Sequence, residues 1–153
     1  MRGEVTVHMD APVERVWDLV TDVTRIGEFS PETFGAEWTK GSTGPSVGAW
    51  FRGHVKRNQR GPTYWTQCQV TRCEPNEAFE FDVKAAGRTV NTWGYVLRPA
   101  GGGTDVTEYF RLPENVGTRI YSALAGRGRG RTNDRNMRAT LERMKAVVER
   151  QAS

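Results

Sequence analysis

The sequence predicts an α+β domain in which an antiparallel sheet packs on one face against helices. Three features indicate this class: a long amphipathic helix at the end of the chain, a series of strand-like stretches before it, and short turns between those stretches. Strands joined by short turns pair antiparallel, and an amphipathic helix needs an apolar surface to cover. We therefore expect residues 1–153 to fold as a single domain.

The final helix is predicted over Thr132–Arg150. Four apolar residues recur at steps of four, three and four, which places them on one face of a helix: Met137, Leu141, Met144 and Val148. Charged residues cover the opposite face, and Thr132 or Asn133 can accept a backbone N–H as the N-cap. A helix with this pattern must lie on the sheet.

The first strand is predicted over 4–10, where apolar and polar residues alternate. A helix should follow, with Asp10 as its cap and Pro12 in its first turn, where the missing N–H is harmless. A second short helical segment fits 24–29, and Pro31 ends it.

Six further strands follow, the first of them a short one over 36–39. Alternation separates the two faces of each strand, and it places His8 and His54 on the outer face. The inner residues expected in the last five strands are Phe51, Gly53 and Val55; Tyr64, Thr66, Cys68 and Val70; Phe79, Phe81 and Val83; Asn91, Trp93, Tyr95 and Leu97; and Val106, Glu108, Phe110 and Leu112.

Cysteine spacing and hydropathy bear on the compartment. Cys68 and Cys73 lie five residues apart in an extended stretch. About 16 Å separates such positions, which exceeds the limit of about 7 Å between the Cα atoms of a disulfide. We expect free thiols, as in a reducing compartment. No apolar run of about 18 residues and no signal-peptide core occurs, so we predict a cytoplasmic protein.

Several segments carry a family resemblance: APVERVWDLVTD, FSPE followed by AEW, VGAWFRGHVKR, YWTQCQVTRCEPNEAFEF, WGYVLRPAGGGTDVTE and ATLERMKAVVE. They are similar to the polyketide cyclase/dehydratase family of the START-like (SRPBCC) superfamily, over nearly the whole chain. The resemblance implies a helix-grip fold, in which a curved antiparallel sheet wraps around the long C-terminal helix and two short helices follow the first strand. It also implies a cavity between sheet and helix for an apolar or aromatic small molecule. Enzymes, lipid carriers and sensors share this scaffold, so the chemistry is less specified than the fold.

The inner faces supply candidate residues for such a cavity. The ligand-binding candidates are Phe51, Tyr64, Thr66, Phe79, Phe81, Asn91, Trp93, Tyr95, Phe110, Met137, Leu141 and Met144. Aromatic rings and flexible methionines suit a flat apolar ligand. The same side chains can instead fill a solid core, and both interpretations stay open at this point.

One polar residue stands out on an inner face. Glu108 lies between Val106 and Phe110, so its carboxyl should point inward, where desolvation raises its pKa. Glu108 and Tyr95 are therefore the candidate catalytic residues, with Glu108 as a general acid or base. The alternative is a structural carboxylate that binds a neighbouring backbone group, Tyr or Arg. We find no cluster with metal-ligand spacing and expect no metal and no cofactor.

The charge pattern limits the partners. The net charge is +4, with one dense basic block, GRGRGR, at Gly126–Arg131. The aromatic residues do not interleave with this block, so we expect no nucleic-acid partner. The block is either a solvated loop or a surface for peripheral contact with an anionic membrane. The apolar segment before it, Gly117–Gly126, is either a mobile lid or a corner between helices.

These observations predict a protein that binds a hydrophobic or aromatic small molecule, lipid-like or polyketide-like, between the sheet and the C-terminal helix. The first alternative is an enzyme, a polyketide cyclase or aromatase, in which Glu108 and Tyr95 move protons. The second is a lipid carrier that docks on membranes through the basic block. We expect a monomer or a weak homodimer.

Overall fold

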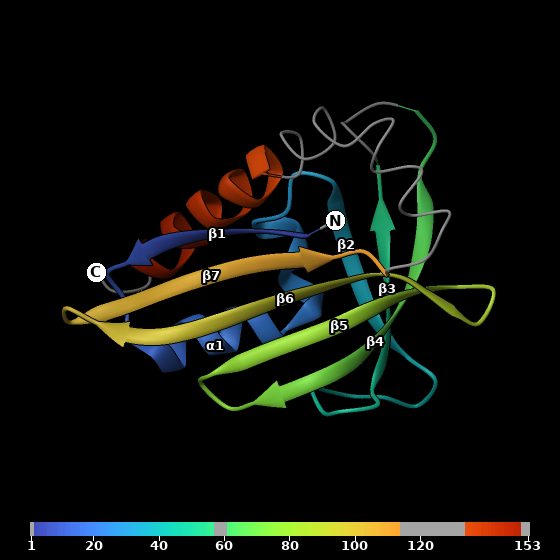
Figure 1. Ribbon diagram of the computed structural model, residues 1–153, viewed down its shortest axis with the longest axis horizontal. Helices are drawn as coiled ribbons and strands as arrows, with labels where there is room; N and C mark the ends of the chain where they lie inside the picture. Colours follow the sequence, from blue (N-terminus) through green and yellow to red (C-terminus); the bar gives the residue numbers. More distant parts are fainter. Residues whose placement is uncertain (1, 57–60, 114–133, 151–153) are drawn as a thin grey trace.

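The computed structural model describes residues 2–56, 61–113 and 134–150 (Figure 1). Its centre is a seven-stranded antiparallel sheet in the order β1-β7-β6-β5-β4-β3-β2. The strands are β1 (Arg2–Met9), β2 (Thr33–Thr39), β3 (Trp50–Val55), β4 (Tyr64–Glu74), β5 (Ala78–Ala85), β6 (Arg88–Ala100) and β7 (Gly103–Arg111). Strands β2 to β7 follow one another as a meander, and β1 joins its far edge by pairing with β7.

Helices cover one face of this sheet. After β1 come α1 (Val13–Thr21) and the 3-10 helix η1 (Val23–Glu28), and residues 134–150 form the C-terminal helix. Figure 1 shows α1 and the C-terminal helix behind the sheet, while β2 and β3 run steeply across strands that otherwise lie nearly flat in the view. The sheet therefore curves around the helices, which confirms the predicted α+β helix-grip fold, including the two short helices after the first strand.

The predicted cap of the first helix is wrong. Pro12, and not Asp10, is the N-cap of α1, and no side chain caps it. Asp10 lies two residues too early to reach the first free N–H groups, and its Oδ1 instead lies 3.2 Å from His8 Nε2. The 3-10 helix η1 does have a side-chain cap, because Thr24 N–H donates to Asp22 Oδ1 at 3.1 Å.

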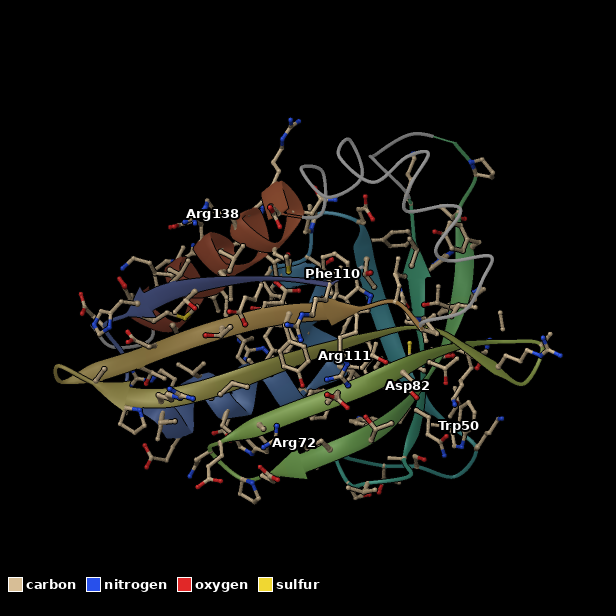
Figure 2. All side chains as sticks on the ribbon, viewed as in Figure 1. Trp50, Arg72, Asp82, Phe110, Arg111 and Arg138 are labelled. Atoms are coloured by element: carbon tan, nitrogen blue, oxygen red, sulfur yellow. The ribbon has the colours of Figure 1, made fainter. Side chains whose placement is uncertain are left out.

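The burial pattern confirms the predicted faces of β3 and β7, although β7 ends at Arg111 and does not include Leu112. Alternate residues of β3 are buried, namely Phe51, Gly53 and Val55, and the same alternation buries Glu108 in β7. The other face carries polar side chains. Figure 2 looks onto that outer face, where Arg72, Asp82 and Arg111 lie. His8 and His54 also lie outside, as expected: His8 is exposed, and the ring of His54 stacks on Trp65 with centroids 4.2 Å apart.

The closed core occupies the space between the sheet, α1 and the later turns of the C-terminal helix. Phe79, Leu141 and Met144 are completely or almost completely buried in it. Trp17 of α1 meets Phe79 edge-on, with ring centroids 6.4 Å apart. Burial of each such side chain contributes about 1.5–3 kcal/mol, so this end of the molecule holds helices and sheet together.

Some predictions lie outside the described residues. These are the N-cap at Thr132 or Asn133, the basic block Gly126–Arg131 and the segment Gly117–Gly126. Because parts of the chain are not described, one domain over 1–153 also stays a prediction. Cys68 and Cys73 are both free, as expected. None of the helices in the described ranges has the length and apolarity needed to cross a bilayer.

Candidate ligand-binding cavity

A cavity of about 380 Å³ lies between the inner face of the sheet and the first turns of the C-terminal helix. This volume falls at the lower end of the ~300–1,000 Å³ typical of small-molecule sites. Its lining residues come from η1 and the segment after it, from β2 to β7, and from the C-terminal helix: Ile26, Ser30, Pro31, Glu32, Thr33, Phe51, Gly53, Val55, Tyr64, Thr66, Cys68, Phe81, Val83, Val90, Asn91, Trp93, Tyr95, Glu108, Asn136, Met137 and Thr140. Tyr64 and Val90 are exposed and mark its mouth.

Aromatic rings form the flat apolar walls. Phe81 on β5 and Trp93 on β6 are direct cross-strand partners. Phe51 meets Phe81 in a T-shaped contact with ring centroids 5.0 Å apart. Behind the wall, Phe110 supports Trp93 at 5.4 Å between centroids. Because each ring is fixed by another, the wall is rigid and suits a flat apolar molecule.

A buried carboxyl group lies at the inner end of the cavity. Glu108 is 5% exposed, and its cross-strand partner on β6 is Tyr95. The Tyr95 hydroxyl donates a hydrogen bond to Glu108 Oε1 at 3.2 Å. Glu108 Oε2 is buried and has no hydrogen-bond partner among the described residues.

Burial changes the acidity of both groups in this pair. Loss of solvation raises the pKa of Glu108 to about 8, and the hydrogen bond from Tyr95 offsets this only in part. Burial, followed by the nearby Glu108, raises the pKa of the Tyr95 hydroxyl well above its usual value. At neutral pH the pair is therefore mainly a neutral acid beside a neutral phenol, which can donate a proton or hydrogen bond to a bound molecule.

Other polar groups lie nearer the mouth. Asn91 Oδ1 is buried without a hydrogen-bond partner in the described part of the chain. Asn136 Nδ2 on the C-terminal helix donates to Glu32 Oε1 at 3.1 Å and so joins the helix to the segment before β2. Burial raises the pKa of the Cys68 thiol to about 12, which makes it an apolar part of the wall and not a nucleophile. Among the described residues, no three His, Cys, Asp or Glu side chains gather as a metal site.

Most of the predicted binding candidates lie at this cavity. The structure places Phe51, Tyr64, Thr66, Phe81, Asn91, Trp93, Tyr95 and Met137 in its wall, together with Glu108. Four candidates do not line it: Phe79, Phe110, Leu141 and Met144. Phe79, Leu141 and Met144 belong to the closed core, where Trp17 of α1 and the later helical turns pack on the sheet. Phe110 is also buried, but it lies behind Trp93 and next to Gly3 of β1. The assignment of these four as ligand contacts is corrected.

The sequence reasoning missed the segment between η1 and β2. Ser30, Pro31 and Glu32 close one side of the cavity, together with Ile26 of η1 and Thr33 at the start of β2, but no periodic pattern marks such a segment. The sequence does contain a signal for two other groups of cavity residues that were missed. Gly53, Val55, Cys68 and Val83 already shared the inner alternation, and Asn136 and Thr140 flank Met137 on the helix.

Comparison with known proteins agrees with this geometry. A family model described as polyketide cyclase/dehydrase and lipid transport matches residues 1–149. The chain belongs to this family. Membership indicates a fold that binds hydrophobic ligands, and it confirms the resemblance found in the sequence. A search of curated proteins gives no match.

Solved structures of proteins from several bacteria share the fold of this chain. A protein from Nitrosomonas europaea is 14% identical, with a TM-score of 0.71 over 99% of this chain and 96% of that chain. One from Arthrobacter aurescens is 20% identical, with a TM-score of 0.69 and coverages of 97% and 86%. A polyketide cyclase-like protein from Corynebacterium glutamicum is 28% identical, with a TM-score of 0.55 and coverages of 96% and 88%.

Proposed function

We propose that this protein binds a hydrophobic or aromatic small molecule, lipid-like or polyketide-like, in the cavity between the sheet and the C-terminal helix. The supporting observation is the cavity of about 380 Å³ with its aromatic wall. Apolar area that leaves water on binding supplies about 25 cal/mol per Å², and the rigid wall needs little reordering. The polar groups Glu108 and Asn91 orient the molecule inside.

A fluorescent apolar dye tests this proposal. We expect the parent protein to bind about one equivalent of dye. Thr66→Trp should block binding, because Thr66 lines the cavity from β4 and a larger ring there fills the space. Gln67→Trp is the matched control, since the next residue of the same strand does not line the cavity. Binding that survives Thr66→Trp, with both variants folded by circular dichroism, would place the site elsewhere.

A second candidate function is that of a polyketide cyclase or aromatase, and the Glu108–Tyr95 pair favours it. A buried neutral acid can protonate a carbonyl oxygen during ring closure. Glu108→Gln keeps the shape of the side chain, so a catalytic role predicts normal dye binding and a loss of polyketone cyclisation of about 100-fold. A purely structural role predicts unchanged turnover with a loss of stability of about 1–3 kcal/mol.

The remaining alternative, a lipid carrier that docks on membranes, depends on the basic block Gly126–Arg131. That block lies outside the described residues, so the alternative stays a prediction from sequence. The same holds for the absence of a nucleic-acid partner and for a monomeric or weakly dimeric state.

A further inference from the structure

The carboxyl of Glu108 has two oxygens in different situations. Oε1 accepts the hydrogen bond of Tyr95 at 3.2 Å. Oε2 is buried, lacks any partner among the described residues and belongs to a side chain that lines the cavity. A buried polar atom without a partner is costly, so a ligand group that pairs with it on binding strengthens the complex. The unpaired oxygen is thus a feature that a ligand can use.

The surroundings of Glu108 determine what kind of group that is. Across the sheet, β1 places Val5 opposite Glu108, and β7 itself flanks it with Val106 and Phe110. From the C-terminal helix, Met137 and Thr140 line the same cavity. Tyr95 is the one titratable side chain, within the described ranges, whose contact affects the pKa of Glu108. The inner end of the cavity therefore has no described cation to pair with an anion.

A carboxyl group in this environment keeps its proton at neutral pH, because its pKa lies at about 8. Since Tyr95 already donates to Oε1, the proton is best carried on Oε2. In that state Glu108 presents an O–H donor to an apolar space. The complementary partner is an uncharged acceptor atom.

We propose that Glu108 binds a carbonyl oxygen of the ligand through the O–H group on Oε2, so that the cavity selects neutral carbonyl-bearing apolar molecules. Ketones, aldehydes and esters carry such an acceptor. A fatty-acid carboxylate is selected against, since burying a charge without a counter-ion is costly. This inference rests on the proposed function, because it concerns the molecule that the same cavity takes.

A pair of dyes tests the inference. The first is a dimethylaminonaphthalene that carries a propionyl ketone, and the second is the same naphthalene without the ketone. Dissociation constants are measured by fluorescence at about pH 6 and about pH 9.5, on either side of the pKa of about 8. Ionised Glu108 cannot donate, so the ketone dye should bind about tenfold more weakly at the higher pH. The dye without the ketone should change by less than about twofold, which also shows that the cavity persists.

Two variants identify Glu108 as the donor. Glu108→Gln keeps an N–H donor without ionising, so it should retain the preference for the ketone dye and lose its pH dependence. Glu108→Met removes the donor at similar size, so it should bind the ketone dye at about pH 6 as weakly as the parent does at about pH 9.5. The comparison of dissociation constants at the two pH values needs only the parent protein, so it remains decisive whether or not either variant folds.

The outcomes separate this inference from the proposed function. A ketone-dye affinity independent of pH in the parent, or a ketone-dye affinity at about pH 6 that is unchanged in Glu108→Met, overturns the role of Glu108 while the cavity still binds. If neither dye binds the parent at about pH 6, the proposed function is overturned together with the inference.

Discussion

The buried carboxyl of Glu108 makes the stability of the folded chain depend on pH. Its pKa is about 8 in the folded state and near the ordinary value of 4.5 when the chain is unfolded. The folded state therefore holds a proton that the unfolded state has released. We expect the contribution of Glu108 to the free energy of unfolding to be fully present below a pH of about 4.5 and to fall as pH rises to about 8, by up to about 1.4 kcal/mol per pH unit.

Urea unfolding of the parent and of Glu108→Gln over this pH range measures the effect. The difference between the two curves isolates Glu108, because His8, whose pKa is raised mainly by its bond to Asp105, contributes equally to both. Tyr95→Phe removes the hydrogen bond that lowers the pKa of Glu108, so the decline should still begin near pH 4.5 but extend to higher pH than in the parent. A difference that does not vary with pH would mean that Glu108 is solvated.

At the scale of elements, the contact between the Tyr109 ring and Gly94 fixes the pairing of β6 with β7. Gly94 on β6 is opposite Tyr109 on β7, and the Tyr109 ring covers it so closely that an added Cβ would lie 2.3 Å from the ring. The Tyr109 hydroxyl then reaches Glu80 Oε2 on β5 at 2.5 Å, where Arg111 also donates at 3.0 Å. One side chain thus links three strands on the outer face.

Gly94→Ala should force the Tyr109 ring away and break its bond to Glu80. We expect a loss of about 1–3 kcal/mol in the free energy of unfolding by urea. Gly35→Ala on β2 is the control, because nothing lies within 4 Å of a Cβ at that position. Equal costs for the two substitutions would show that the ring does not hold the strands.

The C-terminal helix has different neighbours along its length. Its early residues Asn136, Met137 and Thr140 line the cavity, whereas Leu141 and Met144 are fully buried in the closed core. The four-three-four spacing predicts one apolar face of the helix. It does not tell which turns pack in the closed core and which turns line the cavity. A substitution at Leu141 therefore reports on packing, and one at Thr140 on the cavity.

For the whole molecule, the sequence was sufficient for the fold and for the direction of most inner side chains. Alternation with a period of two determines which face a strand residue occupies, so the inward position of Glu108 was predictable. Alternation does not tell whether an inner residue is packed in the closed core or lines the cavity. Phe79 and Phe81 share one face of β5, yet α1 covers Phe79 with Trp17, and Phe81 borders the cavity. That difference depends on which part of the sheet α1 covers, which is a property of the packed molecule.

Irregular segments are the second part of the structure that the sequence does not predict. The residues from Ser30 to Glu32 close the cavity without any periodic pattern, and their position follows from the curvature that brings η1 against β2. The Glu108–Tyr95 hydrogen bond could be anticipated as one of several partners, but its choice required the β6–β7 register. Strands β6 and β7 form a hairpin, whose register depends on the turn type, and the run of glycines between the two strands does not specify that type.

The pairing of β1 with β7 has a consequence for how the chain is made. The hydroxyls of Thr6 and Thr107 lie 2.7 Å apart across this pair, although 101 residues separate them. Contacts between such distant residues form late in folding, because the entropy of closing the loop must be overcome first. During synthesis, β1 leaves the ribosome long before its partner exists, with Val5, Val7 and Met9 exposed to solvent. A nascent chain therefore offers chaperones an uncovered apolar strand until β7 has emerged.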